Sequence, residues 1–292
     1  MASAGALTTV RAAIAHLARN LDGEEALREG EILVAHALGA SPAWLFAHGD
    51  DEIPDATMTV IEALALRRSE GIPIAYLIGR RGFWSLELDV GPDVLIPRAE
   101  TELLVEIALR HIPVDASFSV ADLGTGSGAI ALALARERPH ARVRACDISA
   151  SALAIAENNA RKLGLSNIAF TRSDWFHGLG NERFDVVVSN PPYIASGDPH
   201  LAQGDLRFEP ALALMSGSDG LDAIRHIVRE APAHLRDGGM LAVEHGFEQG
   251  AAVRALMRQS GFVETYTERD LGRRDRVSGG FLPIESATRY KV

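Results

Sequence analysis

Cysteine is nearly absent from the 292 residues of this chain, and long hydrophobic runs are missing altogether. The single cysteine, Cys146, allows neither a disulfide framework nor a cysteine-based metal cluster within the chain. No apolar run reaches about 18 residues, the length that a membrane-spanning helix needs. We therefore expect a protein of the reducing cytoplasm with no membrane segment.

Positive charge is also scarce. The chain has 29 Lys and Arg residues against 39 Asp and Glu residues, and its formal net charge is -10. Proteins that bind along a phosphate backbone neutralise it with Lys and Arg, so we expect no stable nucleic-acid binding. With 47% hydrophobic and 23% charged residues, the composition is that of a globular chain with a sizeable core, and the length allows two domains.

The N-terminal part of the chain has the apolar spacing of helices. Thr8 or Thr9 is placed to cap a first helix. Its apolar side chains recur at helical spacing, at Val10, Ile14, Leu17 and Leu21. Further helices are predicted over residues 24–38 and 56–70, and no set of groups suited to chemistry occurs there. We expect residues 1–80 to form a small helical bundle that acts as a scaffold or a partner-binding surface.

Residues 82–96 leave the helical spacing. A Gly-Pro-Asp turn signal occupies residues 91–93. Apolar residues around it have the pattern of strands, at Phe83, Leu86, Leu88 and Val90. We predict a β-hairpin linker over residues 81–97, followed by a second domain over residues 98–292.

A glycine-rich loop follows the strand predicted over residues 119–123. It reads Gly124-Thr125-Gly126-Ser127-Gly128 and leads into a helical run. Three glycines at the carboxyl end of a strand let the backbone approach a ligand closely. The third glycine follows the second by two residues, whereas dinucleotide-binding proteins place it three residues on. The spacing therefore argues against a nicotinamide-dependent oxidoreductase.

Acidic residues end the next two predicted strands. Asp147 follows the strand over residues 141–146, where an acid can accept hydrogen bonds from both ribose hydroxyls. Asp174 and Trp175 follow the strand over residues 168–172, where the acid can reach an adenine amino group and the indole can stack on the ring. Because the carboxyl ends of parallel strands meet at one edge of a sheet, we predict a nucleoside site on a doubly wound sheet.

The run Ser189-Asn190-Pro191-Pro192-Tyr193-Ile194 ends a short apolar strand. The two prolines leave the carbonyls of Asn190 and Pro191 without ladder partners. The Asn190 side-chain oxygen and the Pro191 carbonyl can each accept one hydrogen of a planar N–H₂ group, and Tyr193 can pack on its face. Such a nitrogen is a poor nucleophile, so an enzyme must align it with a strong electrophile.

These features together carry a resemblance. The loop from Asp122 to Gly128, Asp147 and the N-P-P-Y run resemble class I S-adenosylmethionine-dependent methyltransferases that act on planar nitrogens. Five further runs resemble the bacterial peptide chain release factor glutamine methyltransferases: R-R-S-E-G-I-P-I-A-Y-L-I-G at 67–79, V-L-I-P-R-A-E-T-E at 94–102, F-E-P-A-L-A-L at 208–214, V-E-H-G-F-E-Q at 243–249 and D-L-G-R-R-D-R at 270–276. Departures from the family pattern lie outside the predicted transfer site, at Ala99, Ser216 and His245.

The resemblance implies an α/β fold. A Rossmann-like, seven-stranded class I methyltransferase domain with an antiparallel last strand would follow the helical bundle and the β-hairpin linker. The implied reaction moves a methyl group from S-adenosyl-L-methionine to the side-chain amide nitrogen (N5) of the glutamine in the Gly-Gly-Gln motif of class 1 peptide chain release factors, which supports translation termination. The helical domain would bind the release factor. We expect the enzyme to be a cytoplasmic monomer.

The resemblance also assigns residues. The cofactor would be held by Gly124, Thr125, Gly126, Ser127, Gly128, Asp147, Asp174, Trp175 and Asn190. The glutamine would be held by Asn190, Pro191, Pro192 and Tyr193, of which Asn190, Pro191 and Tyr193 form the catalytic group. No metal takes part, because direct in-line transfer needs none.

Two other substrate classes stay open. An adenine-N6 DNA methyltransferase or a guanine-N2 ribosomal RNA methyltransferase would use nearly the same N-P-P-Y chemistry, because those nitrogens are planar as well. The acidic charge and the lack of an obvious base-recognition segment count against both. A binding module that kept the fold without the activity should have lost Asn190 or Asp147, and both are present.

Overall fold

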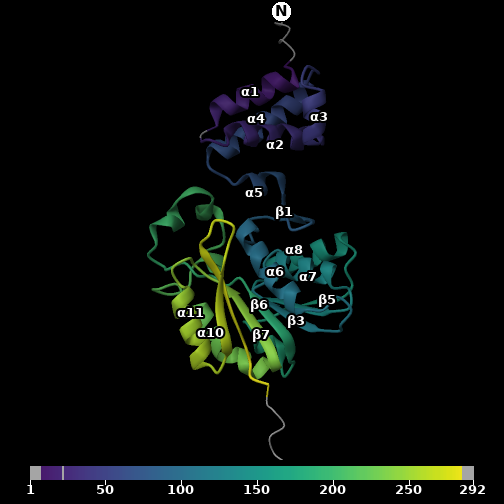
Figure 1. Cartoon of the computed structure of the whole chain (residues 1–292). Coiled ribbons are helices and arrows are strands. Elements are labelled where there is room, and N and C mark those ends of the chain that lie inside the picture. Colours follow the sequence, from purple (N-terminus) through teal and green to yellow (C-terminus); the bar gives the residue numbers. More distant parts are fainter. Residues whose placement is uncertain (1–7, 22, 285–292) are drawn as a thin grey trace, which may run out of the picture. The chain divides into compact units, whose positions relative to one another are not determined.

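The computed structural model describes residues 8–21 and 23–284, which divide into two compact units (Figure 1). The first unit holds the described residues up to Gly79 together with Ala202–Phe208. The second holds Arg80–Leu201 and the described chain from Glu209 onward. No helix among these residues combines the length and the hydrophobicity of a transmembrane segment.

The first unit is helical, as the sequence predicts. Thr9 caps the first helix, because its hydroxyl accepts the backbone N–H of Ala12 at 3.3 Å. Apolar faces of the helices meet in a buried core that includes Leu17, Leu33 and Ile61. The helices are α1 (Val10–Asn20), α2 (Ala26–Leu38), α3 (Pro42–Ala47), α4 (Asp55–Ser69) and α5 (Ile74–Ile78).

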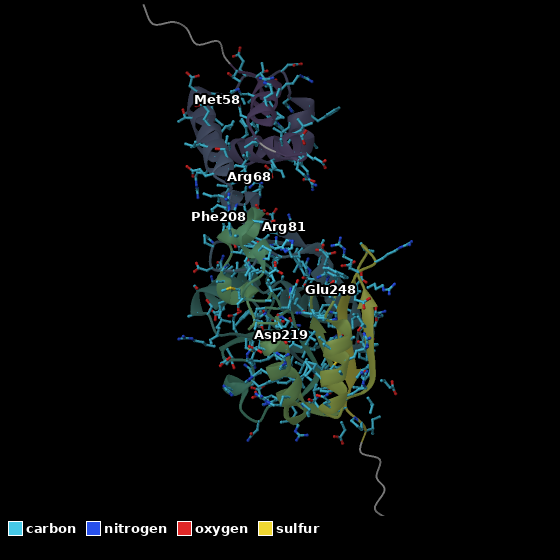
Figure 2. All side chains as sticks on the ribbon, turned by 90° about the vertical axis from the view of Figure 1, so that its left-hand side faces the viewer. Met58, Arg68, Arg81, Phe208, Asp219 and Glu248 are labelled. Carbon is cyan, nitrogen blue, oxygen red and sulfur yellow. The ribbon has the colours of Figure 1, made fainter. Side chains whose placement is uncertain are left out.

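A later stretch of the chain completes this unit. It contains the short helix η4 (Gly204–Phe208), which follows η3 (Pro199–Ala202). Arg68, labelled in Figure 2, donates to both carboxylate oxygens of Glu29 at 2.8 Å and lies 3.4 Å from Asp205 Oδ1. Arg207 donates to the backbone carbonyl of Glu70 at 3.0 Å. Arginine contacts from both stretches therefore hold residues 202–208 within the helical unit.

The predicted hairpin is present, but its turn lies elsewhere. It consists of β1 (Arg80–Phe83) and β2 (Leu86–Asp89), so the Gly-Pro-Asp signal at 91–93 lies beyond the second strand. The turn falls at Trp84, which has a φ of 56°. Its backbone N–H donates to Glu102 at 2.8 Å and its indole N–H to Glu137 at 2.9 Å. These two long-range contacts compensate the strain of a positive φ at a bulky residue.

The second unit is built on a seven-stranded sheet. Its spatial order is β5-β4-β3-β6-β7-β9-β8, with β9 antiparallel to both neighbours and the first five strands parallel. The last strand is therefore antiparallel, as the family resemblance implies. The strands are β3 (Ser119–Leu123), β4 (Arg142–Asp147), β5 (Ile168–Arg172), β6 (Phe184–Ser189), β7 (Leu235–Glu244), β8 (Val263–Arg269) and β9 (Asp275–Phe281).

Helices cover both faces of this sheet (Figure 1). Strand β6 shows the reason, because Val186 and Val188 pack in one core cluster and Val187 in the other. Burying each valine contributes about 1.5–3 kcal/mol. One face is covered by α6 (Glu102–His111), α7 (Ala129–Glu137) and α8 (Ala150–Lys162), and the other by α10 (Asp222–His234) and α11 (Gly250–Gln259). Short helices η1 (Ala99–Thr101), η2 (His177–Leu179) and α9 (Ala211–Leu214) lie in the connections.

Candidate active site

A cavity of about 590 Å³ opens at the carboxyl edge of the parallel strands. Its volume is in the range of about 300–1,000 Å³ that small-molecule sites occupy. Most of the predicted site residues line it, namely Gly124, Thr125, Gly126, Ser127, Asp147, Asp174, Trp175, Asn190 and Pro192. Gly128, Pro191 and Tyr193 are not part of its wall. The order of the sheet reverses between β3 and β6, which is the position where doubly wound sheets bind ligands.

The glycine loop after β3 needs its glycines. Gly124, Gly126 and Gly128 have φ values of 73°, 56° and 87°, a region that residues with a side chain rarely adopt. At Gly128 a Cβ would also lie 2.8 Å from Leu132 Cδ1 and 3.2 Å from Ala156 Cβ. The third glycine therefore allows α7 and α8 to pack closely, and the first two shape the loop that lines the cavity.

Asp147, the last residue of β4, joins two parts of the cavity wall. Its Oδ2 accepts the backbone N–H of Gly126 at 2.9 Å, and its Oδ1 accepts the backbone N–H of Ser149 at 2.9 Å. Each carboxylate oxygen has a further lone pair for a ligand hydroxyl. The acid therefore connects the glycine loop after β3 to the residues that follow β4.

Asp122 of β3 is a buried acid that the sequence analysis placed in the motif but gave no role. Burial raises the pKa of its carboxyl to about 7. The hydroxyl of Thr125 donates to its Oδ2 at 2.6 Å and opposes that rise. Asp122 therefore fixes the glycine loop through the hydroxyl of Thr125. The signal in the sequence was an acid inside an otherwise apolar strand.

Trp175 packs against the glycine loop. Its ring lies 3.5 Å from the position that a Cβ on Gly124 would take. The residue has a φ of 48°, and its backbone carbonyl accepts the hydroxyl of Ser173 at 2.6 Å. The side chain is partly buried and lines the cavity together with Asp174. A flat aromatic surface is thereby offered beside the loop.

The N-P-P-Y turn begins at Asn190, after β6. Ser189 fixes the strand end, because its hydroxyl donates to the carbonyl of Leu123 at 2.7 Å. The Asn190 side-chain nitrogen donates to Thr101 Oγ1 at 3.1 Å. With that nitrogen committed, the side-chain oxygen is the atom left to accept an N–H from a ligand.

Tyr193 is held by the neighbouring strand. Its hydroxyl donates to Glu244 Oε1, the last residue of β7, at 3.1 Å. Burial, together with the charge of Glu244, raises the pKa of the phenol. The carbonyl of Tyr193 accepts the side-chain amide of Gln249 at 3.0 Å. These contacts fix the far end of the turn and connect it to the V-E-H-G-F-E-Q run.

Two other predicted runs meet beside the cavity. Arg98, from the V-L-I-P-R run, forms an ion pair with Glu209, whose side chain is buried. The other carboxylate oxygen of Glu209 accepts the backbone N–H of Ile96 at 2.9 Å. Arg98 lines the cavity, so Glu209 of the F-E-P run fixes one part of its wall.

Thr101 and Glu244 are polar residues of the site that sequence analysis did not assign. Thr101 directly precedes α6, but its side chain makes no capping hydrogen bond. Instead it lines the cavity and accepts a hydrogen bond from the Asn190 side-chain nitrogen. Burial raises the pKa of Glu244 to about 7, while hydrogen bonds from Thr101 and Tyr193 and the charge of Arg276 oppose the rise.

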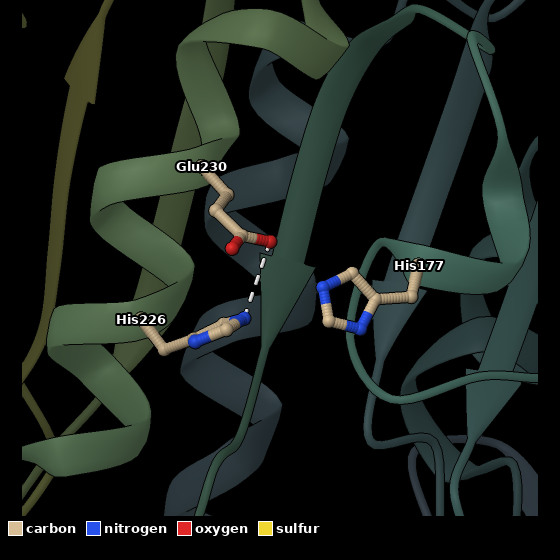
Figure 3. A group of neighbouring side chains, drawn as sticks. All are labelled: His177, His226 and Glu230. Carbon is tan, nitrogen blue, oxygen red and sulfur yellow. Dashed lines mark ion pairs between the residues drawn. The ribbon is translucent and has the colours of Figure 1, made fainter.

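His177, His226 and Glu230 lie close together (Figure 3), and His226 also lines the cavity. Their ligand atoms lie within 4.8 Å of one another. His226 Nδ1 lies 3.2 Å from the guanidinium of Arg229, and its Nε2 lies 3.1 Å from Glu230 Oε2. Because a guanidinium only donates, the proton of a neutral ring is on Nε2, facing the carboxylate. Nε2 is buried and makes no hydrogen bond among the described residues, although it lies near the carboxylate of Glu230.

Comparisons with known proteins agree with this geometry. Residues 9–79 match the PrmC N-terminal domain family and residues 98–208 the methyltransferase small domain family. The release factor glutamine methyltransferase of Xylella fastidiosa strain Temecula1 is 56% identical over 87% of this chain and 93% of its own length. That of Pseudomonas aeruginosa is 49% identical over 89% and 94%. The Thermus thermophilus 16S rRNA N2 G1207 methyltransferase, solved with AdoMet and guanosine, has a TM-score of 0.51 at 22% identity, covers 70% of this chain and 49% of that one, and shows a shared fold.

Proposed function

This chain belongs to the release factor glutamine methyltransferases, and we propose that its turn at Asn190 holds the side-chain amide of the glutamine that is methylated. The enzyme transfers a methyl group from S-adenosylmethionine to a glutamine of a release factor. The observation that supports the proposed roles is the position of Asn190 and Pro192 on the same cavity as the glycine loop and Asp147. A methyl donor and a planar amide would meet there.

The residues of the cavity fit S-adenosylmethionine. The glycine loop offers a surface free of side chains at Gly124 and Gly126, and the ring of Trp175 lies beside it. Asp147 provides a carboxylate for the ribose at the end of β4. When bound, the cofactor supplies an electrophilic methyl group on a sulfonium. Asp174, which lines the same cavity, would accept a hydrogen bond from the adenine amino group.

Asn190 and Pro191 would orient the glutamine. The Asn190 side-chain oxygen accepts one amide hydrogen and the Pro191 carbonyl accepts the other, which fixes the nitrogen in space. Tyr193, held through Glu244, would support the amide from its planar face. Fixing a weak nucleophile in line with its electrophile lowers the barrier by several kcal/mol, and preorganised acceptors stabilise the positive charge that develops on the nitrogen.

The remaining proposals concern the partner and its recognition. The substrate would be the Gly-Gly-Gln glutamine of class 1 release factors. Residues 1–80 would bind the release factor, with residues 81–97 as linker and residues 98–292 as the methyltransferase domain. The match of residues 9–79 to the PrmC N-terminal domain family supports a dedicated module there. The enzyme would act as a monomer in the cytoplasm, without stable nucleic-acid binding.

One experiment separates this function from nucleic-acid methylation. Purified protein is given labelled S-adenosylmethionine with a class 1 release factor, with its Gly-Gly-Gln to Gly-Gly-Ala variant, with duplex DNA and with ribosomal RNA. We expect label on the intact motif alone. Label on DNA or RNA and none on the release factor would overturn the proposal, because the same turn would then hold a base amino group.

A further inference from the structure

We infer that Thr101 is a positioning residue that determines which end of the Asn190 side-chain amide faces the substrate, and that Glu244 sets the direction of the hydrogen bond between them. The inference rests on the proposed function of the Asn190 turn. It adds two residues, from η1 and β7, to a site otherwise assigned to strand ends and loops.

The need for such a device follows from the chemistry of an asparagine. The two ends of its amide have nearly the same shape, but one end donates two hydrogens and the other only accepts. A glutamine N–H₂ must meet the oxygen of Asn190. If the amide were turned over, donors would face donors. The native hydrogen bond from Asn190 Nδ2 to Thr101 Oγ1, 3.1 Å long, selects the productive orientation.

Glu244 makes the Thr101 hydroxyl an acceptor toward Asn190. A threonine hydroxyl has one hydrogen and two lone pairs, so by itself it would serve either end of the amide. The Thr101 hydroxyl lies close enough to the Glu244 carboxyl to lower its pKa through a hydrogen bond. Above its pKa of about 7 the carboxyl is ionised and only accepts, so the Thr101 hydrogen then points to Glu244 and its lone pairs point to Asn190. Tyr193 also donates to Glu244, which leaves the carboxylate as the common acceptor of both contacts.

Burial makes this arrangement specific. Thr101 is 4% exposed and Glu244 is 1% exposed, so water does not replace a missing partner easily. Arg276, which is ion-paired with Asp270 at 3.1 Å, contributes a positive charge that offsets the charge of Glu244. Asn190 and Tyr193 therefore each have a neighbour that fixes their role as donor or acceptor, while Glu244 Oε2 is buried without a hydrogen-bond partner among the described residues.

Variants at Thr101 test the inference. Thr101→Val keeps the shape and removes the hydroxyl, whereas Thr101→Ser keeps the hydroxyl. For methylation of the release factor, we expect Thr101→Val to lower kcat about 10–100-fold, in line with the loss of a hydrogen bond at a buried polar site. Thr101→Ser should stay within about threefold of the wild type. The KM for S-adenosylmethionine and the Tm should change little in both.

A matched control is Thr267→Val in β8. It removes a hydroxyl that is 2.7 Å from Ser278 Oγ and does not line the cavity. It should leave kcat unchanged. If Thr101→Val kept full kcat, or if its loss were matched by an equal loss of cofactor binding or of Tm that Thr101→Ser did not restore, Thr101 would be a structural residue and the inference would be wrong.

A second variant tests the role of Glu244. Glu244→Gln puts an amide beside Thr101, and its N–H₂ can donate to the hydroxyl and reverse the direction of the hydrogen bond. We expect a lower kcat with cofactor binding retained. Unchanged kcat in this variant would remove Glu244 from the inference.

The orientation of Asn190 can also be followed without any substrate. The ¹H–¹⁵N signals of its side-chain amide should shift or broaden in Thr101→Val and stay in place in Thr267→Val. This measurement decides the positioning role even if the wild-type enzyme failed to methylate a release factor, an outcome that would overturn the proposed function alone. Signals identical in wild type and Thr101→Val would overturn the inference.

Discussion

The carboxylate of Asp147 accepts the backbone N–H of Gly126 at 2.9 Å, so the acid at the end of β4 holds the glycine loop that follows β3. Asp147→Asn would place an N–H₂ group against one of the two backbone donors and lose the carboxylate for the ribose. We expect the Kd for S-adenosylmethionine to rise about 10–100-fold, measured by calorimetry, as for the loss of a charged hydrogen bond. Asp237→Asn, an exposed acid, serves as control. Equal Kd values for the two variants would contradict the assignment.

Asn190→Ala should act on turnover. The variant removes the acceptor of one amide hydrogen in the transition state, and losses of about 10²–10³-fold in kcat are typical for such groups. Cofactor affinity should fall much less. Single-turnover kinetics and equilibrium binding of the cofactor provide the comparison, with the exposed Asn20→Ala of α1 as control. A loss of affinity as large as the loss of kcat would count against the role of Asn190 in holding the glutamine.

Glu244 should make the stability depend on pH. Burial raises the pKa of its carboxyl from 4.5 to about 7, so the folded protein keeps a proton that the unfolded chain has lost between these values. Stability from this group is fully present below pH 4.5 and declines as the pH rises to about 7. The glutamine side chain of Glu244→Gln does not ionise in this pH range. The Tm of this variant relative to the wild type should therefore be higher at pH 8 than at pH 5.

The comparison of Glu244→Gln with the wild type is needed because burial shifts the pKa of Asp122 in the same direction as that of Glu244. Burial raises the pKa of Asp122 from 3.8 to about 7, so a wild-type curve alone would mix the two carboxyls. A Tm difference that stays constant across the pH range would show that Glu244 ionises normally.

Gly128→Ala should destabilise the methyltransferase unit. The substitution would force a side chain into a φ of 87° and against Leu132 and Ala156. A cost of about 1–3 kcal/mol is expected from the backbone conformation. Gly82→Ala is a matched control, because a Cβ at that position would have no heavy atom within 4 Å and the φ of Gly82 is not positive. Chemical denaturation of both variants gives the free energies of unfolding, and equal values would contradict the argument.

Removal of divalent metal should leave the reaction unchanged. Direct methyl transfer requires no Lewis acid, and His226 Nδ1 already has the guanidinium of Arg229 as a neighbour at 3.2 Å. Dialysis against EDTA should therefore not alter kcat on the release factor. Loss of activity that added Zn²⁺ restored would reassign the cluster of His177, His226 and Glu230 as a metal site.

Much of the site followed from the sequence because parallel strands bring their carboxyl ends to one edge. The glycine loop, Asp147, the Asp174–Trp175 pair and Asn190 each stand at the end of a predicted strand, and a single rule places all of them together. The glycine pattern also predicts the backbone conformation of the loop, since only glycine adopts three positive φ values so close together without strain.

Thr101 and Glu244 could not be found in this way. Thr101 lies 89 residues from Asn190, and a threonine before a helix has an ordinary local explanation as a cap. Glu244 ends a strand that is otherwise apolar, where an acid gives no indication of its partner. The hairpin turn was misplaced for a related reason: the Gly-Pro-Asp signal is local, whereas the contacts of Trp84 with Glu102 and Glu137 depend on the folded structure.

The place of residues 202–208 in the helical unit matters for protein engineering. They come after Asn190 in the chain, yet Asp205 and Arg207 have their partners at Arg68 and Glu70. A truncation at Gly79 would leave both side chains behind without those partners. The chain thus enters the helical unit twice, and a minimal catalytic fragment must redesign the second passage as well as remove the first.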